Sequence, residues 1–258
     1  MLLAALLPFE GAEGSAGGSP EMIESVFGPG ETLTYRVRYG FIETARATVE
    51  VGKDRRGNLG EVWPITLDAS TTRLVGRLYS LDTHFVTHYL PREERTLGFD
   101  RDSEERGGLR VTRVRLDPRG NKAVVIRETP GEPAEQETYD TGPARHDIAS
   151  AIFWLRDRPL NVGDVERVRI FTGRKAWDLV ATVIGLDRVR TSSGRMEAKL
   201  VRLKTYFEGQ AAAKRDIEVW MTNDDHHIPV ALRADLALGS LRADLLDYSP
   251  PSGMSHQP

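Results

Sequence analysis

The sequence of 258 residues predicts a mainly β fold: a large antiparallel meander that forms a curved, barrel-like sheet, with one amphipathic helix packed against it. Apolar and polar residues alternate with a period of two along most of the chain, as they do in half-buried strands. Short polar turns separate most of these segments. The segment at about 147–157 instead places its apolar residues at helical spacing, which predicts the helix.

The first strand shows the alternation most clearly. In the stretch LTYRVRY, residues 33–39, every second side chain is apolar or aromatic. Gly40 interrupts the pattern, which resumes over residues 45–51, so a bulge or a sharp bend is expected at Gly40. Further strands are predicted near residues 61–69, 83–90, 109–116, 122–128, 165–171, 177–184, 196–207, 217–222, 228–238 and 241–247. About a dozen strands in sequence favour a meander that closes into a barrel or folds into a sandwich.

The predicted helix lies in the segment HDIASAIFWLRDRPL. Asp147 is well placed to cap its start, and Pro159 ends it. Its apolar stripe consists of Ile148, Ala151, Ile152 and Leu155. Because one face of the sheet must be covered, we expect the helix to pack across the concave face, with Phe153 or Trp154 at the rim of a cavity. A shorter helical turn is predicted within residues 71–80.

The side chains also predict how the hairpin around DDHH is paired. If Asp224–His227 form a four-residue loop, Val219 faces Leu232 and Met221 faces Val230, and the apolar residues share one buried face. Asp and Asn side chains suit such turns because they hydrogen-bond to nearby backbone. The loop is therefore expected to be a solvent-exposed hairpin tip.

The last hairpin is predicted to close at Gly239-Ser240, where glycine comes first in a two-residue turn. This closure would place Ala234 opposite Leu245 on the buried face. It would also pair Asp235 with Asp244, a like-charge match that neighbouring arginines could neutralise.

Two pairs of residues are candidates for a metal site. Asp224 and His227 lie in the DDHH loop, but a metal site needs three or four converging ligands and adjacent residues at a loop tip rarely point at one centre. His84 and His88 share one face of a predicted strand, where residues four apart are separated by ~13 Å. We therefore expect a solvated turn and an ordinary strand at these places, with no metal and no cofactor.

The composition narrows the possible functions. The formal net charge of -3 gives no reason to expect nucleic acid as a partner, and the arginines, spread evenly between acidic residues, are interpreted as compositional bias. The absence of cysteine excludes disulfides, zinc–thiolate sites and thiol catalysis. The sequence also has no P-loop, dinucleotide-binding fingerprint, nucleophile elbow or metalloprotease motif.

The chain is expected to consist of a signal-like or disordered N-terminus (1–20), a single β-rich domain (30–248) and a disordered tail (249–258). The apolar run Leu2–Leu7, followed by small residues, resembles the end of a secretory signal's apolar region, although the basic leading segment is missing. No later stretch reaches the ~20 apolar residues of a membrane span. We therefore expect an exported protein without a transmembrane span.

Three stretches of the sequence resemble a known family: GETLTYRVRYGFIETARATVEV, HDIASAIFWLRDRPLNVGD and EVWMTNDDHHIPVALRADLALGSLRADL. In the same order, over about Gly30 to Tyr248, the chain resembles a bacterial envelope family numbered 3108 among the domains of unknown function. The most specific parts of the resemblance are Gly30-Glu31, Leu155-Arg156, Val219-Trp220 and Ile228-Pro229-Val230. Members typically carry arginine before the Ile-Pro pair, where this chain has His227. The resemblance implies an exported, β-rich protein and implies no particular activity.

Three classes of function remain open. In the first, the protein is a non-catalytic envelope protein whose sheet and helix enclose a cavity for a lipid, a lipid-linked glycan or another amphipathic ligand. The expected ligand contacts are Phe153, Trp154, Arg156 and Trp220. In the second, two carboxylates across a polar groove hydrolyse envelope glycans. The third is a structural or assembly role. The expected location is the periplasm or the outer membrane's inner face.

Overall fold

The computed structural model describes residues 25–55, 60–72, 81–105, 108–117, 121–192, 194–208, 210–211, 216–235 and 239–253. The expected N-terminal segment, 1–20, lies outside the described residues, as does most of the helical turn expected within residues 71–80. The expected C-terminal tail starts at the last residue of the final strand, and residues 254–258 again lie outside. No helix in the described part of the chain is long and apolar enough to cross a membrane.

Antiparallel strands make up most of the fold, as the alternating pattern predicted. The first half of the chain contributes β1 (Thr32–Tyr39), β2 (Ile42–Val51), β3 (Asp54–Arg55), β4 (Glu61–Thr71), β5 (Leu81–Leu90), β6 (Arg95–Glu105), β7 (Gly108–Leu116), β8 (Lys122–Glu128) and β9 (Glu135–Asp140). The second half contributes β10 (Val165–Phe171), β11 (Ala176–Thr191), β12 (Gly194–Phe207), β13 (Gln210–Ala211), β14 (Ile217–Thr222), β15 (Pro229–Asp235) and β16 (Ser240–Ser249). A 3-10 turn, η2 (Pro91–Glu93), follows β5, and the α-helix α2 (Ile148–Arg156) separates the two halves.

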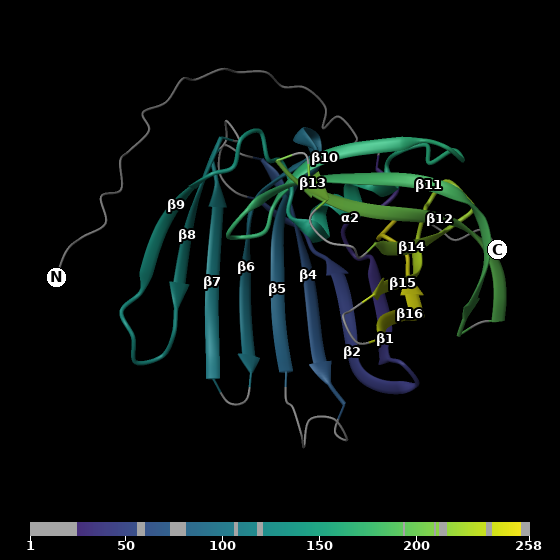
Figure 1. The fold of residues 1–258 in the computed structure, drawn as a ribbon, viewed down its shortest axis with the longest axis horizontal. Helices are drawn as coiled ribbons and strands as arrows, with labels where there is room; N and C mark the ends of the chain where they lie inside the picture. The colour runs from purple at the N-terminus through teal and green to yellow at the C-terminus, as the bar shows by residue number, and fades with distance from the viewer. Residues whose placement is uncertain are drawn as a thin grey trace.

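The strands form one sheet in the order β10-β11-β12-β14-β15-β16-β1-β2-β4-β5-β6-β7-β8-β9, with β13 paired to β12 and β3 to β4. The sheet curls on itself. Figure 1 shows this, with β4 to β8 running vertically and β10, β11 and β12 crossing above them. Its two ends, β9 and β10, do not pair with each other among the described residues. The predicted mainly β, barrel-like fold is confirmed, and its sheet is open.

The segment that precedes α2 connects β6, an internal strand of one arm of the sheet, with β10, the edge strand of the other arm. The carbonyl of Arg145 accepts a hydrogen bond from the N–H of Thr96 on β6 at 2.8 Å, and the N–H of Arg145 donates to Arg169 on β10 at 3.2 Å. The next carbonyl, that of His146, accepts from Phe171 at 2.8 Å. We call the place where Arg145 and His146 join β6 to β10 the seam of the sheet. The chain enters α2 at this seam, so the helix is fixed between the two arms of the sheet.

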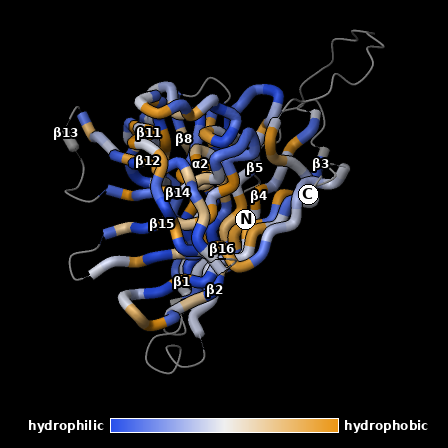
Figure 2. Tube along the Cα trace, turned by 90° about the vertical axis from the view of Figure 1, so that its right-hand side faces the viewer, coloured by the Kyte–Doolittle hydropathy of each residue, from blue (hydrophilic) through white to orange (hydrophobic). Residues whose placement is uncertain are grey.

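The helix packs across the concave face of the sheet, as predicted. Ala151 and Leu155 belong to an apolar cluster built with β10, β11, β12 and β14. Phe153 belongs to a second cluster built with β1, β2, β4 and β5. Apolar positions accordingly gather in the middle of the molecule, around α2 and β4 (Figure 2). We call this concave, helix-covered side the inner face and the opposite side the outer face.

The start of α2 has the predicted cap, but its apolar stripe differs from the prediction. The Asp147 carboxylate accepts hydrogen bonds from the N–H groups of Ala149 at 2.8 Å and Ser150 at 3.1 Å, and the Ser150 hydroxyl accepts from the Asp147 N–H at 3.0 Å, a capping box. Ile148 is 38% exposed, whereas Phe153 is buried. The helix lies between two arms of the sheet, so two of its sides are covered rather than one.

The sequence did not predict β6 and β9. Beyond Phe99, β6 carries polar and charged residues on both faces, and β9 (EQETYD) is a polar edge strand without aliphatic residues. The period-two signal depends on apolar inner positions, so it vanishes where the inner face is polar. The prediction for β11 likewise ended at residue 184, although the strand continues to Thr191.

The hairpin of β14 and β15 has nearly the predicted register. Val219 pairs with Leu232 as expected. Met221 pairs with Pro229 rather than with Val230, because the register shifts at an irregularity beside Met221. A bulge of this kind changes the pairing locally and leaves no trace in the alternation of the sequence.

The predicted register of the last hairpin was wrong. Ala234 pairs with Leu241 rather than with Leu245, so β15 and β16 are joined by a longer connection than a two-residue turn. The displacement keeps the same residues on the inner face, because it spans an even number of positions. It also removes the unfavourable match of Asp235 with Asp244.

Candidate functional site

A buried ion pair ties the end of α2 to the start of β1. Arg156 donates to both oxygens of Glu31, with Nη1–Oε2 at 2.9 Å and Nη2–Oε1 at 2.7 Å, and both side chains are 0% exposed. The Tyr248 hydroxyl donates to the same carboxylate at 3.0 Å. Burial opposes the charge of Arg156, but the hydrogen bonds and charge of Glu31 outweigh it and raise the pKa of Arg156.

A tight turn places Glu31 at this position. The N–H of Glu31 donates to the carbonyl of Gly28 at 3.1 Å, with Pro29 and Gly30 between them. Proline followed by a glycine with φ 91° fits a type II turn. A side chain at Gly30 is excluded, because its Cβ would lie 2.1 Å from Ser252 Oγ. The turn at Gly28-Pro29-Gly30 thus places the carboxylate at the end of the helix.

Two of the four predicted ligand contacts, Phe153 and Arg156, meet in the core. The Arg156 guanidinium lies 5.3 Å from the centre of the Phe153 ring and 5.6 Å from that of Phe27. The rings of Phe27 and Phe153 are 4.9 Å apart. These side chains pack α2 against β1, β2, β4 and β5. Neither Phe153 nor Arg156 lines a pocket described below.

Of the other two predicted contacts, Trp154 lies on the same helix but packs against the other apolar cluster, and Trp220 belongs to a separate cluster. Trp154 is half-buried, with its ring centre 5.6 Å from that of His146. Trp220 lies on the outer face, where its indole N–H donates to Asp187 at 2.8 Å and the Arg242 guanidinium lies 5.3 Å from its ring centre. The four residues do not form one site.

The four metal candidates are likewise distributed over the fold. His84 contacts Asp68 at 2.6 Å, and His88 contacts Asp100 at 3.0 Å, each across neighbouring strands. Asp224 caps its own loop, where its carboxylate accepts from the N–H of His226 at 3.0 Å. Within the described ranges, no three His, Asp or Glu residues come together as a metal site would require.

The structure corrects the expectation that the whole 224–227 loop is exposed. Asp224 is exposed, but His227, with φ 45°, is 4% exposed and turned towards α2. Its Nδ1 donates to the carbonyl of Arg156 at 2.8 Å, so Nε2 accepts from Lys199 Nζ at 2.9 Å. Burial lowers the pKa of His227, and the Lys199 charge adds to that effect. The imidazole is a neutral link between the loop and the end of the helix.

A polar pocket of about 710 Å³ lies on the inner face of β5 to β8; we call it the inner pocket. Strand pairing places Arg101 opposite Thr112 and Ser103 opposite Arg110, so these four side chains share one face. That face is continuous with the buried pair of Phe99 and Val114. The β10–β11 turn forms the facing wall of the pocket. The inner face thus changes from apolar to polar along each strand.

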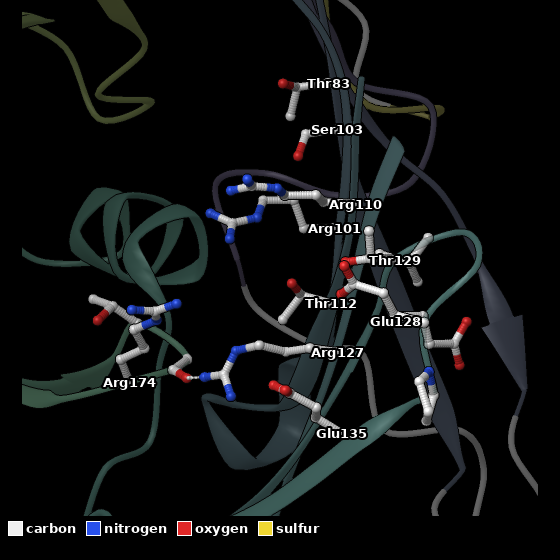
Figure 3. A pocket seen from close by; sticks show the side chains of 15 residues that line it. Thr83, Arg101, Ser103, Arg110, Thr112, Arg127, Glu128, Thr129, Glu135 and Arg174 are labelled. Carbon is white, nitrogen blue, oxygen red and sulfur yellow. Dashed lines mark hydrogen bonds between the residues drawn. The ribbon is translucent and has the colours of Figure 1, made fainter. Parts of the chain in front are cut away.

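Arginines from three elements converge in the inner pocket. Arg101 on β6 and Arg110 on β7 extend into it side by side, and Arg174 of the β10–β11 turn enters from the facing wall (Figure 3). None of these three forms an ion pair with a residue whose side chain is described. Arg127 on β8 is held differently, since it donates to the carbonyl of Gly173 at 2.7 Å. The free guanidinium groups can bind a carboxylate or a phosphate in a bidentate manner.

The rest of the inner pocket offers hydroxyl and carboxylate groups. Thr83 and Ser103 lie beyond the arginines, and Glu128 and Glu135 lie on the side towards β8 and β9 (Figure 3). Both glutamates are exposed. The pocket can therefore accept hydrogen bonds from hydroxyl groups as well as donate them to an anion.

Sequence reasoning missed the inner pocket because its arginines are far apart in the chain. Arg101 and Arg174 belong to segments that meet only after the sheet curls. A signal was present, however: Phe99 and Arg101 are two positions apart on one face, as are Val114 and Thr112. Polar residues that continue an apolar face mark the place where it becomes accessible.

Comparison with solved structures supports the barrel-like architecture. The crystal structure of a beta-barrel-like protein of domain of unknown function DUF1849 from Brucella abortus matches with a TM-score of 0.62 and 12% identity, over 88% of this chain and 99% of that chain. At such identity the similarity concerns the fold alone.

Two further structures match over most of their length with low TM-scores. One is a protein with a YmcC-like fold from Bacteroides fragilis, with a TM-score of 0.33 and 11% identity over 87% of this chain and 99% of that chain. The other is a candidate lipoprotein from Parabacteroides distasonis, with a TM-score of 0.33 and 9% identity over 89% and 100%. A comparison with curated proteins finds none of similar sequence.

The family assignment rests on the sequence itself. The model of one family matches residues 34–246, from the third residue of β1 almost to the end of β16. The match therefore covers nearly all of the curved sheet together with α2. The chain belongs to the family described as "Protein of unknown function (DUF3108)", in agreement with the resemblance seen in its motifs.

Proposed function

We propose that this chain is a non-catalytic protein of the bacterial cell envelope that binds the anionic part of a glycan, such as the head of a lipid-linked glycan, in the inner pocket. The observation that carries the proposal is the convergence of Arg101, Arg110 and Arg174, none of which forms an ion pair with a described carboxylate; Glu137 acts on Arg174 only through its charge. Exposed arginines on a strand normally pair with acids across the sheet, as Arg113 does with Asp102.

The other groups of the inner pocket suit a sugar. Thr83, Ser103 and Thr112 can donate and accept hydrogen bonds, and Glu128 can accept them from sugar hydroxyls. The pocket is lined mainly by polar groups, which favours a glycan or phosphate group over an acyl chain. The lipid part of an amphipathic ligand would lie outside the inner pocket.

The cellular location belongs to the proposal as well. Its support is the apolar run Leu2–Leu7 followed by small residues, which resembles part of a secretory signal. Fractionation of cells that express the full chain, with sequencing of the mature N-terminus, tests it. We expect a periplasmic or outer-membrane-associated protein that starts after about residue 20; recovery of intact Met1 in the cytosol would refute export.

A second candidate function is hydrolysis of the bound glycan, which is favoured by Glu128, Glu132 and Glu135 in the same pocket. A glycosidase needs one carboxyl group that stays protonated near neutral pH, usually because it is buried. All three glutamates are exposed. Their exposure supports binding over catalysis.

The ligand can be identified by mass spectrometry of molecules that remain bound to protein purified gently from envelope extracts. We expect an anionic glycan on the wild-type protein and its loss from the double variant Arg101→Gln/Arg110→Gln. The matched control is Arg167→Gln, which removes an exposed arginine of β10 outside the inner pocket. Equal retention by both variants, or an uncharged ligand, would contradict the proposal. Release of a shortened glycan by the wild type, abolished in Glu128→Gln, would instead favour hydrolysis.

A further inference from the structure

The turn between β1 and β2 carries Phe41, the most exposed large apolar side chain among the described residues, beside two further exposed apolar residues. Phe41 is fully exposed, Ile42 is 56% exposed and Tyr39 is 39% exposed. Hairpin tips are usually polar, as the β14–β15 tip with Asp224 and Asp225 is here. Contiguous apolar residues at a tip mark a surface that contacts a protein or a membrane.

The local backbone explains how these residues are presented. Tyr39 pairs with Ile42, so Gly40 and Phe41 form a two-residue turn, which is the sharp bend predicted at Gly40. Gly40 has φ 57°, which suits the first position of a type II′ turn. Such a turn needs glycine and has no need of phenylalanine at the next position. The fold alone therefore does not account for Phe41.

The apolar tip continues onto the neighbouring hairpin. The N–H of Gly40 donates to the carbonyl of Ser240 at 3.2 Å. A Cβ on Gly239 would lie 3.0 Å from the Tyr39 hydroxyl, so the two turns are in contact. Leu241, the next residue of β16, is 37% exposed. We call Tyr39, Phe41, Ile42 and Leu241 the apolar tip; it lies at the lower end of the sheet in Figure 1, away from α2.

An arginine-rich cleft of about 510 Å³ lies on the outer face behind the apolar tip. Its lining includes Arg36 and Arg38 of β1, Arg242 of β16, and Arg188 and Arg190 of β11. The carboxylates in this lining are Asp187 and Asp244, so the cleft carries more positive than negative groups.

Part of this positive charge is already compensated. Arg38 and Arg242 both bind Asp244, at 2.5 Å and 2.6 Å. Arg36, Arg188 and Arg190 form no ion pair with residues whose side chains are described. A net positive cleft beside an apolar tip is complementary to an anionic lipid surface, where apolar side chains enter the boundary of head groups and acyl chains and arginines contact phosphates.

We propose that the apolar tip and the arginines behind it dock the protein on the surface of an anionic lipid bilayer. Phe41 and Ile42 enter the interfacial layer, while Arg188, Arg190 and Arg36 contact lipid phosphates. The long alkyl stems of arginine allow this reach from a position behind the tip. The proposal concerns a different face from the inner pocket and does not depend on the pocket's ligand.

Cosedimentation with vesicles tests the proposal. The full chain is mixed with vesicles of phosphatidylcholine alone or with added phosphatidylglycerol, at low and at high salt. We expect binding to the anionic vesicles that weakens as salt is raised, because the arginine contribution is screened. Phe41→Asp should lower the affinity by about tenfold or more. The double variant Arg188→Gln/Arg190→Gln should lower it by about fivefold per charge.

Two control variants carry the same kinds of change elsewhere. Val162→Asp places a charge at another exposed apolar residue, 62% exposed in the turn after α2, and Arg167→Gln removes an exposed arginine. Both should bind vesicles as the wild type does. The proposal is overturned if the wild type fails to bind anionic vesicles, if neutral vesicles bind equally well, or if Phe41→Asp binds unchanged. The last result would show that the tip does not enter the bilayer.

Discussion

The arginines at the two ends of the inner face differ in burial and in pairing. At the end covered by α2, Arg156 is fully buried and donates to both oxygens of Glu31. At the open end, Arg101 and Arg110 are exposed in a polar pocket and form no ion pair with the described side chains. A buried charge must be paired for the fold to be stable. A solvent-accessible charge needs no such partner and stays available to bind a ligand. The contrast separates residues that hold the fold from residues that can act.

The largest effect is expected from a variant that removes the partner of the buried arginine at the covered end. Glu31→Gln leaves Arg156 as a buried charge without its carboxylate and should cost about 3–5 kcal/mol of the free energy of unfolding, measured by urea denaturation. Glu128→Gln in the inner pocket makes the same chemical change at an exposed position and should stay within about 0.5 kcal/mol. Equal losses in the two variants would contradict the proposed division of roles.

A second variant tests how firmly α2 is buried between the two arms. Leu155→Ala removes a side chain that is 2% exposed and should cost about 2–5 kcal/mol. Ile148→Ala, at the exposed end of the same predicted stripe, should cost less than about 1 kcal/mol. Thermal or urea unfolding of both variants distinguishes them. A Leu155→Ala protein as stable as the wild type would show that the helix does not close the core.

His146 should make stability depend on pH near the seam of the sheet. Burial lowers its pKa to about 3, and the charges of Arg145 and Arg158 act in the same direction. The unfolded chain then binds a proton that the folded chain does not, so stability falls as pH decreases from about 6.5 towards about 3. At pH 5 the resulting loss in the free energy of unfolding is about 2 kcal/mol.

The His146 contribution is isolated by comparison with His146→Gln. The difference in the free energy of unfolding between wild type and variant should shift against the wild type as pH is lowered from 7.5 to 5, by ~2 kcal/mol. The variant retains the neighbouring Asp147, whose carboxyl group also titrates. A difference that stays constant with pH would show that folding does not lower the pKa of His146.

The smallest expected effect concerns the metal candidates. Added zinc should leave the unfolding temperature unchanged, because His84 and His88 contact separate carboxylates and Asp224 caps its own loop. Differential scanning calorimetry with and without micromolar zinc measures this. A rise of several degrees that His227→Ala abolishes would reinstate the loop as a metal site.

The sequence predicted the parts of the fold in which the inner face is apolar. The alternation from Leu33 to Tyr39 marks β1, and the spacing of Ala151 and Leu155 marks α2. It could not predict β6, whose inner positions carry Arg101 and Ser103 beyond Phe99. The strand that escaped prediction is therefore one that builds the candidate site.

Contacts between distant segments were also beyond the sequence pattern. Glu31 and Arg156 are 125 positions apart, and periodicity says nothing about such pairs. Both, however, belong to motifs that carried the family resemblance, Gly30-Glu31 and Leu155-Arg156. An acid and a base that recur in two separate family motifs are reasonable candidates for a buried ion pair. The same reasoning would not have found the arginines of the inner pocket, which lie outside these motifs.

The central claim is that the open end of the inner face binds an anion through Arg101, Arg110 and Arg174. The most direct measurement is a calorimetric titration of the full chain with a phosphorylated disaccharide and with its dephosphorylated counterpart. We predict saturable binding of the phosphorylated sugar only, weakened by salt and lost in Arg101→Gln/Arg110→Gln, while Arg167→Gln binds as the wild type does. Equal binding of both sugars, or unchanged binding by the double variant, would contradict the claim.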